Sequence, residues 1–356
     1  MHSGFGNEHA TEAVAGALPQ GQNNPQECPF QLYAEQLSGT AFTAARAANL
    51  RSWLYRLRPS VDHHTFAPLE TRNYVAASEY GEATTEAIPR IVCSFAELKC
   101  NPNQMRWNPL PIPESGTPTD FLDGIVTICG SGDAAEKKGC AIHVWAANAS
   151  MQRSFYNADG DLLMVPQEGA IKVRTELGLL AVAPGEIVVV PRGIVFQVAL
   201  ESQASRGYIL ETFKGHFQLP DLGPIGANGL ANPRDFKYPV AAFDAPGVPS
   251  DTAVGHVVAV KMGGVLFSQE LTRSPYDVVA WHGNYAPYKY ALANFCTINT
   301  VSFDHPDPSI FTVLTCPSDT PGEAAADFVI FPPRSVVAER TLHTYYTTQL
   351  FQDLVG

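Results

Sequence analysis

The sequence lacks the patterns that mark several common classes of protein. Only 16% of its 356 residues are charged, the net charge is -12, and no block of five or more like charges occurs. It therefore lacks the clusters of basic residues that bind DNA, RNA or an anionic membrane surface. No apolar run approaches the roughly 18 residues of a membrane span, and no apolar segment of a secretory signal follows Met1. We therefore expect a cytoplasmic protein with a small-molecule substrate.

Cysteine and glycine are present, but not in patterns that form a metal or nucleotide site. The seven cysteines are an odd number without a Cys-x-x-Cys pair, so we interpret them as reduced thiols. The glycine-rich loop over 219–235 contains no Gly-x-Gly-x-x-Gly motif between a strand and a helix, which excludes dinucleotide binding there.

Short strands separated by turns dominate the middle of the chain. Apolar residues make up 45% of the sequence, enough to form a large core. The strands follow one another so closely that they indicate antiparallel sheets in a sandwich or barrel instead of βαβ units. We predict strands at 142–146, 162–165, 171–175, 179–183, 186–190, 194–200, 208–213, 256–260 and 265–268.

The regions on either side are less regular. We expect residues 1 to about 60 to be largely irregular, with a short helix starting over 34–37 and a half-buried strand over 51–57. Residues 60–140 are interpreted as loop-rich. Two later strands, at 310–315 and 327–331, indicate a second sheet-built unit. We therefore divide the chain into a β-rich domain over 1–270 and the start of a second domain over 271–356.

One motif in the central region resembles the second sequence motif of cupins. It reads Gly185-x5-Pro191-x-Gly193-x2-Phe196. The position of Phe196 is normally a metal-binding histidine in that motif, and a phenyl ring cannot bind a metal. The preceding loop, 157–161, also lacks the paired histidines that such a site needs. We therefore predict a structural barrel, with this loop as a hairpin turn.

The stretch 278–290 offers the best candidate for a chemical group. A β-branched run leads to His282 and then to a Gly-Asn turn. Imidazole suits proton transfer near neutral pH, and a strand end at a turn can present it rigidly. A structural histidine bonded to the backbone is the alternative. Tyr285, Tyr288 and Tyr290 follow, and they either wall a pocket or belong to the ordinary core.

Seven stretches together resemble the homogentisate 1,2-dioxygenase family. They are SGFGNE (3–8), QNNPQ (22–26), LYAEQLSG (32–39), RSWLYR (51–56), LPDLGPIGANGLANPRD (219–235), VAWHGNY (279–285) and FDHPDPSIFT (303–312). The resemblance spans residues 3 to about 334. It implies a cupin-like β-sandwich or jelly-roll N-terminal domain, an incomplete C-terminal jelly-roll domain, and a hexamer built as a dimer of trimers.

The resemblance also implies chemistry. Members of the family use a mononuclear non-haem iron(II) and O2 to open the ring of homogentisate to maleylacetoacetate, in tyrosine and phenylalanine breakdown. His282 matches the histidine that the family uses as acid and base, so this role replaces the structural interpretation as our preferred one. A neutral imidazole can take a phenol proton and return it later when its pKa lies near the working pH.

The resemblance weakens at the C-terminus. The family carries Tyr-Tyr-His-x5-Glu there, and this histidine and glutamate bind iron, whereas here Thr347 follows the two tyrosines and Asp353 stands six positions later. The family's second histidine ligand has no counterpart before Gly356. We therefore expect a truncated or divergent member that binds iron(II) weakly and opens no ring on its own. No metal ligand or substrate-binding residue is assigned.

Two alternatives remain open at this stage. The chain is either a dioxygenase by descent, active when a partner or a longer form supplies the missing ligands, or a metal-free remnant that is inert or serves as an assembly or binding subunit. In both, we expect an incomplete second sheet with an apolar face or an unpaired edge near 310–315 and 327–331.

Overall fold

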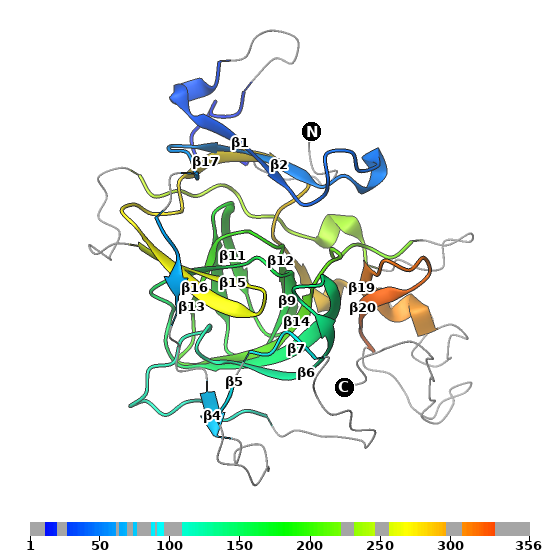
Figure 1. Cartoon of the computed structure of the whole chain (residues 1–356). Coiled ribbons are helices and arrows are strands. Elements are labelled where there is room, and N and C mark those ends of the chain that lie inside the picture. Colours follow the sequence, from blue (N-terminus) through cyan, green and yellow to red (C-terminus); the bar gives the residue numbers. More distant parts are fainter. Residues whose placement is uncertain are drawn as a thin grey trace.

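The protein is built almost entirely from strands (Figure 1). The computed structural model describes residues 11–19, 27–61, 64–69, 74–76, 87–89, 91–95, 109–221, 231–245, 256–296 and 308–331. Within these ranges the helices are short 3-10 turns, and none is long and apolar enough to cross a membrane.

The described elements have the following bounds. The strands are β1 (Tyr33–Ser38), β2 (Arg51–Arg56), β3 (Ala67–Pro68), β4 (Tyr74–Ala76), β5 (Ala87–Pro89), β6 (Ile125–Asp133), β7 (Lys138–Ala147), β8 (Ser154–Asn157), β9 (Asp161–Glu168), β10 (Ile171–Thr175), β11 (Gly178–Val182), β12 (Glu186–Val190), β13 (Phe196–Leu200), β14 (Ser205–Thr212), β15 (His256–Met262), β16 (Val265–Leu271), β17 (Val278–Gly283), β18 (Tyr288–Ala291), β19 (Thr312–Pro317) and β20 (Ala324–Val329). The 3-10 turns are η1 (Pro29–Gln31), η2 (Arg46–Ala48), η4 (Pro233–Asp235), η5 (Leu292–Asn294) and η6 (Pro308–Phe311).

Two large sheets enclose the main core. One has the order β11-β10-β13-β8-β15-β16-β3 and the other β18-β12-β9-β14-β7-β6. Neighbouring strands run antiparallel, apart from the parallel pair β8 and β15. Side chains of both sheets meet in one apolar cluster that includes Val173 and Phe196 from the first and Met164 and Val188 from the second. This arrangement confirms the predicted mainly β, sandwich-type class.

Strand periodicity explains which faces are buried. Along β10, Ile171 and Val173 point into the core while Lys172 is exposed, as the two-residue repeat of a strand requires. Strand β12 is different because its apolar run is continuous and both of its faces are buried. Its inner face joins the main core, and its outer face packs in a second cluster with residues of β19.

The small sheet of β19 and β20 covers the outside of the six-stranded sheet (Figure 1). Val313 and Leu314 are 0% and 1% exposed, so the apolar face expected along 310–315 is buried. The expected apolar face was wrong there, because β12 and β9 supply an apolar surface for these side chains. The alternative of an unpaired edge stays a prediction, since β19 and β20 form a two-stranded sheet in the described part of the chain. At the other strand of the pair, Val329 is 43% exposed and Phe331, just beyond it, is 54% exposed.

A third sheet, of order β1-β2-β17, joins the N-terminal region to residues 278–283 (Figure 1). The predicted strand over 51–57 is confirmed as β2, but the helix predicted over 34–37 is wrong. These residues form β1, whose Gln36 lies opposite Trp53 of β2. Strand β6 also lies in a region that was interpreted as loop-rich.

The division of the chain near residue 270 stays a prediction. The strands β17 and β18 both follow that point, yet β17 pairs with β2 and β18 pairs with β12. Within the described residues, strands that follow residue 270 therefore pair with strands that precede it.

Candidate functional site

His282 lies at the C-terminal end of β17, in a strand that is held on both sides. On one side β17 pairs with β2. On the other, the backbone N–H of Trp281 donates to the carbonyl of Thr11 at 3.0 Å. The β-branched Val278 and Val279 favour the extended backbone that this position requires. The backbone that carries the imidazole is therefore fixed from two directions.

The turn after His282 is fixed as well. Gly283 has a φ of +136°, and a Cβ there would lie 2.3 Å from the carbonyl oxygen of Arg51, so only glycine fits without strain. Asn284 Oδ1 accepts from the backbone N–H of Arg51 at 2.8 Å, and its Nδ2 donates to the carbonyl of Asn49 at 2.8 Å. The predicted Gly-Asn turn thus anchors the strand end to the start of β2.

The imidazole of His282 rests against Tyr55 of β2. The Tyr55 hydroxyl lies 3.0 Å from His282 Nε2, and the two rings stack with centroids 5.8 Å apart and an interplanar angle of 28°. Burial raises the pKa of the Tyr55 phenol, and the nearby Cys28 raises it further, so the hydroxyl keeps its proton at neutral pH. His282 itself is partly buried.

The aromatic residues around His282 in the sequence belong to the core. Each of three side chains donates to a distant backbone carbonyl: Trp281 Nε1 to Leu177 at 2.8 Å, Tyr285 Oη to Arg192 at 2.7 Å, and Tyr288 Oη to Phe217 at 3.2 Å. Tyr290 stacks on Phe236 at 4.5 Å between ring centroids. Of the two alternatives for the tyrosines, these contacts favour ordinary core.

A second histidine, His216, was not singled out from the sequence. Its Nδ1 lies 3.0 Å from the Asp161 carboxylate, and its Nε2 donates to the carbonyl of Gly39 at 2.7 Å. Both neighbours are acceptors, so both ring nitrogens carry protons and His216 is an imidazolium. Burial lowers the pKa of His216, but the hydrogen bond and charge of Asp161 outweigh burial and raise it overall. No local sequence signal marks this pair, because its members come from distant segments.

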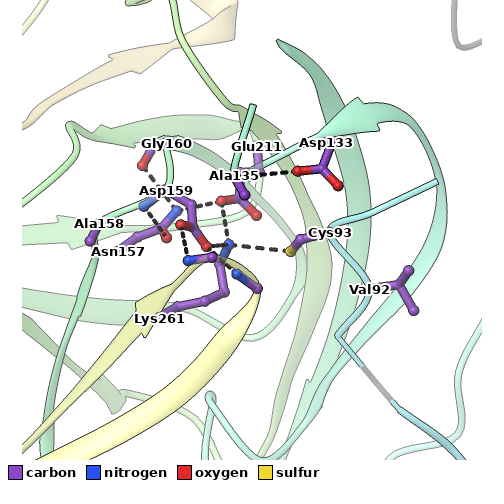
Figure 2. Close-up of polar contacts among 12 residues, drawn as sticks. Val92, Cys93, Asp133, Ala135, Asn157, Ala158, Asp159, Gly160, Glu211 and Lys261 are labelled. Atoms are coloured by element: carbon purple, nitrogen blue, oxygen red, sulfur yellow. Dashed lines mark hydrogen bonds and ion pairs between the residues drawn. The ribbon is translucent and has the colours of Figure 1, made fainter. Parts of the chain in front are cut away.

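The barrel holds a buried charged cluster around Lys261 (Figure 2). The Lys261 ammonium donates to Asp159 Oδ2 at 2.8 Å, to Glu211 Oε1 at 2.6 Å and to Cys93 Sγ at 3.3 Å. His143 Nε2 lies 3.0 Å from the other oxygen of Glu211. A lysine side chain therefore sits among the acidic groups of the cluster.

Burial and neighbouring charges together shift the pKa values of Glu211 and Cys93 in this cluster. Burial alone raises the pKa of Glu211, but the charge of Lys261 and the hydrogen bond of His143 outweigh burial and set this pKa at about 2. Burial raises the pKa of Cys93 to about 12 despite the nearby ammonium, so its thiol is protonated and unreactive. The ion pairs of Lys261 with Asp159 and Glu211 are suited to hold the barrel together.

The remaining motif positions are structural too. Phe196 is 0% exposed, and its ring packs edge-on against Phe155 at 5.5 Å and against Phe121 at 6.4 Å. Asn157 Nδ2 donates to the carbonyl of Gly160 at 2.9 Å and thereby closes the hairpin turn. Both contacts agree with the prediction of a structural barrel.

A cavity of about 310 Å³ opens beside Arg56, whose guanidinium is already paired with carboxylates. The Arg56 guanidinium binds Glu35 at 2.9 Å, Asp277 at 2.8 Å and, most closely, Glu176. Burial raises the pKa of Glu176 even though Arg56 opposes it. With all three carboxylates on one guanidinium, Arg56 ties β2 to the barrel and is not available to a ligand.

The described residues do not supply an iron site. No group of three or more histidine, cysteine, aspartate or glutamate side chains in that part of the chain lies close enough to hold a metal ion. His305, Thr347 and Asp353 fall outside the described ranges. The expectation of weak iron binding concerns Thr347 and Asp353, not His305, and it stays a prediction.

Comparison with known proteins matches the whole chain. The family model described as Homogentisate 1,2-dioxygenase N-terminal covers residues 1–292, and the model described as Homogentisate 1,2-dioxygenase C-terminal covers residues 293–356. A protein of Dictyostelium discoideum named homogentisate 1,2-dioxygenase is 52% identical over 345 residues, which are 97% of this chain and 74% of that protein. A protein of the same name from Oryza sativa subsp. japonica is 51% identical over 356 residues, or 99% of this chain and 72% of that protein.

The matched solved structures each cover a small part of the chain. One, a cupin-2 domain-containing protein from Shewanella frigidimarina, is 17% identical, covers 24% of this chain and 79% of its own, and gives a TM-score of 0.20. An overlap this small has no bearing on the function of the chain.

Proposed function

The chain belongs to the homogentisate 1,2-dioxygenase family, and we propose that it is a ring-cleaving dioxygenase acting on homogentisate and O2. The product is maleylacetoacetate, which places the reaction in tyrosine and phenylalanine breakdown. The observation that carries the proposal is identity above 50% across nearly the whole chain with two relatives of that name. The alternative of a metal-free remnant gains no support from these relatives.

His282 is the group to which we assign the proton transfers. A neutral imidazole takes the proton of a ring hydroxyl as the substrate binds and returns it after ring opening. The site supports this role because β17 is held on both sides and the Gly-Asn turn fixes its end. The Tyr55 hydroxyl lies 3.0 Å from His282 Nε2.

Iron(II) is the metal that the family resemblance implies. The described residues offer no ligand set for it. We propose that the enzyme is a cytoplasmic hexamer. Support for these statements comes from the composition and from the family resemblance.

The role of His282 is tested by the variant His282→Gln in an oxygen-uptake assay with homogentisate and excess iron(II). We expect turnover to fall roughly 10²–10⁴-fold, the usual contribution of a positioned acid or base, while iron content stays the same. His256→Gln, on β15 of the barrel, is the matched control and should retain its turnover. Unchanged turnover in His282→Gln would remove the assignment, and lost iron would make His282 a metal ligand instead.

A further inference from the structure

Tyr55 and His282 form a diagonal pair across two neighbouring strands. In the antiparallel pairing of β2 and β17, Tyr55 lies opposite Ala280, and His282 is two residues further along the same strand. Residues two apart on a strand point to the same face, so the two side chains meet on one face of the sheet formed by β1, β2 and β17. Sheet geometry, and not a flexible loop, therefore sets their distance.

The phenol is the rigid partner of this pair. The Tyr55 side chain is 7% exposed and packs in an apolar cluster with Ala17, Leu32, Val279 and Ala280. The imidazole lies against it through two contacts at once, the 3.0 Å contact between Oη and Nε2 and the stacked rings. The hydrogen bond fixes the rotation of the imidazole about its own axis, and the stacking fixes the plane of the ring.

A phenol suits a partner that must gain and lose a proton. Its oxygen accepts a hydrogen bond from a protonated ring nitrogen, and its O–H donates to an unprotonated one. The contact therefore survives both states of an acid and base. A carboxylate in the same place would favour the imidazolium and bias the histidine toward the protonated form.

We propose that Tyr55 is a positioning residue for His282, holding its imidazole in one orientation through the proton-transfer cycle. The proposal rests on the proposed function for its kinetic consequence. The orientation of the imidazole is a property of the folded chain and is measurable without turnover.

The spectroscopic test is the ring-nitrogen NMR signal of His282 in protein labelled with ¹⁵N-histidine, assigned by its loss in His282→Gln. In Tyr55→Phe we expect the Nε2 signal of His282 to move, because the hydroxyl that lies 3.0 Å from Nε2 is lost, while the signals of the other histidines stay in place. Tyr276→Phe is the matched control, since it removes a hydroxyl that lies 2.9 Å from the Ser154 hydroxyl. It should leave the His282 signal unchanged.

The kinetic test is a double-mutant cycle. Loss of one hydrogen bond predicts that Tyr55→Phe lowers kcat about tenfold and changes the KM for homogentisate little. In a His282→Gln background the same substitution should have almost no further effect, because a residue that acts through His282 cannot contribute once His282 is gone. A general structural role would lower activity by the same factor in both backgrounds.

The outcomes separate this inference from the proposed function. An unchanged His282 signal in Tyr55→Phe, or equal losses of kcat in both backgrounds, overturns the positioning role and leaves the proposed function intact. If His282→Gln itself keeps full turnover, the assignment of His282 as acid and base fails. The NMR signal of His282 in Tyr55→Phe still tests the positioning of the imidazole, because it does not depend on turnover. Thermal unfolding of Tyr55→Phe beside Tyr276→Phe checks that both variants fold.

Discussion

The buried cations Arg56 and Lys261 each bind more than one carboxylate, so removing either cation takes the same counter-charge from several groups. Lys261 shows this most clearly, because its ammonium is the cation that binds both Asp159 and Glu211. Replacing it by an apolar residue would leave two carboxylates in the barrel without that counter-charge. A buried ion pair adds little stability compared with apolar residues of similar volume. Removing only one partner is strongly destabilising, because the other charge stays buried without its counter-charge.

We predict that Lys261→Met lowers the free energy of unfolding by about 3–5 kcal/mol, measured by urea denaturation. The control is Lys172→Met on the exposed face of β10, where the ion pair with Glu201 is open to solvent. That variant should lose less than about 1 kcal/mol. Similar losses in the two variants would show that the barrel cluster does not stabilise the fold in the way described.

His216 makes stability depend on pH in a definite direction. Its folded-state pKa is raised by Asp161 above the ordinary value, so the folded state binds the proton more tightly than the unfolded state. The resulting stabilisation is fully present below the unfolded pKa of about 6.5 and is lost as the pH rises through the folded pKa.

We therefore expect the difference in unfolding free energy between the protein and His216→Gln to be larger near pH 6 than near pH 9. Denaturation curves of both proteins at the two pH values measure it, and the comparison cancels the titration of other groups. A difference that is constant with pH, or that grows toward high pH, would contradict the imidazolium assigned to His216.

At the scale of elements, the end of β17 depends on one backbone conformation. Gly283 has a positive φ, and its Cα faces the backbone of Arg51 and Ser52. Any side chain there strains the backbone and pushes β2 away from β17, which would move His282 relative to Tyr55.

We predict that Gly283→Ala costs about 1–3 kcal/mol of stability and also lowers turnover, because β17 carries the imidazole. Gly322→Ala is the control, since Gly322 also has a positive φ of +85° but a Cβ there would meet nothing within 4 Å. Its turnover should be unaffected. Full turnover in Gly283→Ala would show that the strand end does not need to be fixed.

Elements with a strong local pattern were predictable from the sequence. The alternation of β10 and the continuous apolar run of β12 each specify a strand, and the structure gives both the predicted bounds. The helix predicted over 34–37 failed because the pairing of β1 with β2 outweighed the local preference. Strand β6 was missed because it includes Gly130 and Gly132, which weaken a strand signal.

The same limit applies to the site. His282 could be found from the strand and turn around it and from the family resemblance, but Tyr55 could not. Its contact with His282 spans 227 residues of sequence and exists only through strand pairing. The burial of Lys261 could not be predicted either, because a lysine in a strand is expected at the surface. Only the structure shows Asp159 and Glu211 beside it.

At the scale of the whole molecule, the N-terminal region and the candidate site form one unit. Strands β1, β2 and β17 build the three-stranded sheet, and the segment at Thr11 pairs with β17 from the other side. His216 and Arg56 then bind this sheet and its loops to the barrel. The position of His282 is therefore set by contacts that are distant in sequence.

As a whole, the chain is proposed to open the ring of homogentisate. The expectation from the sequence, that the chain alone binds iron(II) weakly and opens no ring, stays a prediction. The proposed function leads to the opposite result in the same measurement. The most direct test is oxygen uptake by the purified chain after anaerobic loading with excess iron(II), with metal content measured in parallel. The account predicts uptake that requires homogentisate, consumes one O2 per substrate molecule and yields maleylacetoacetate. Bound iron without any homogentisate-dependent uptake would contradict it.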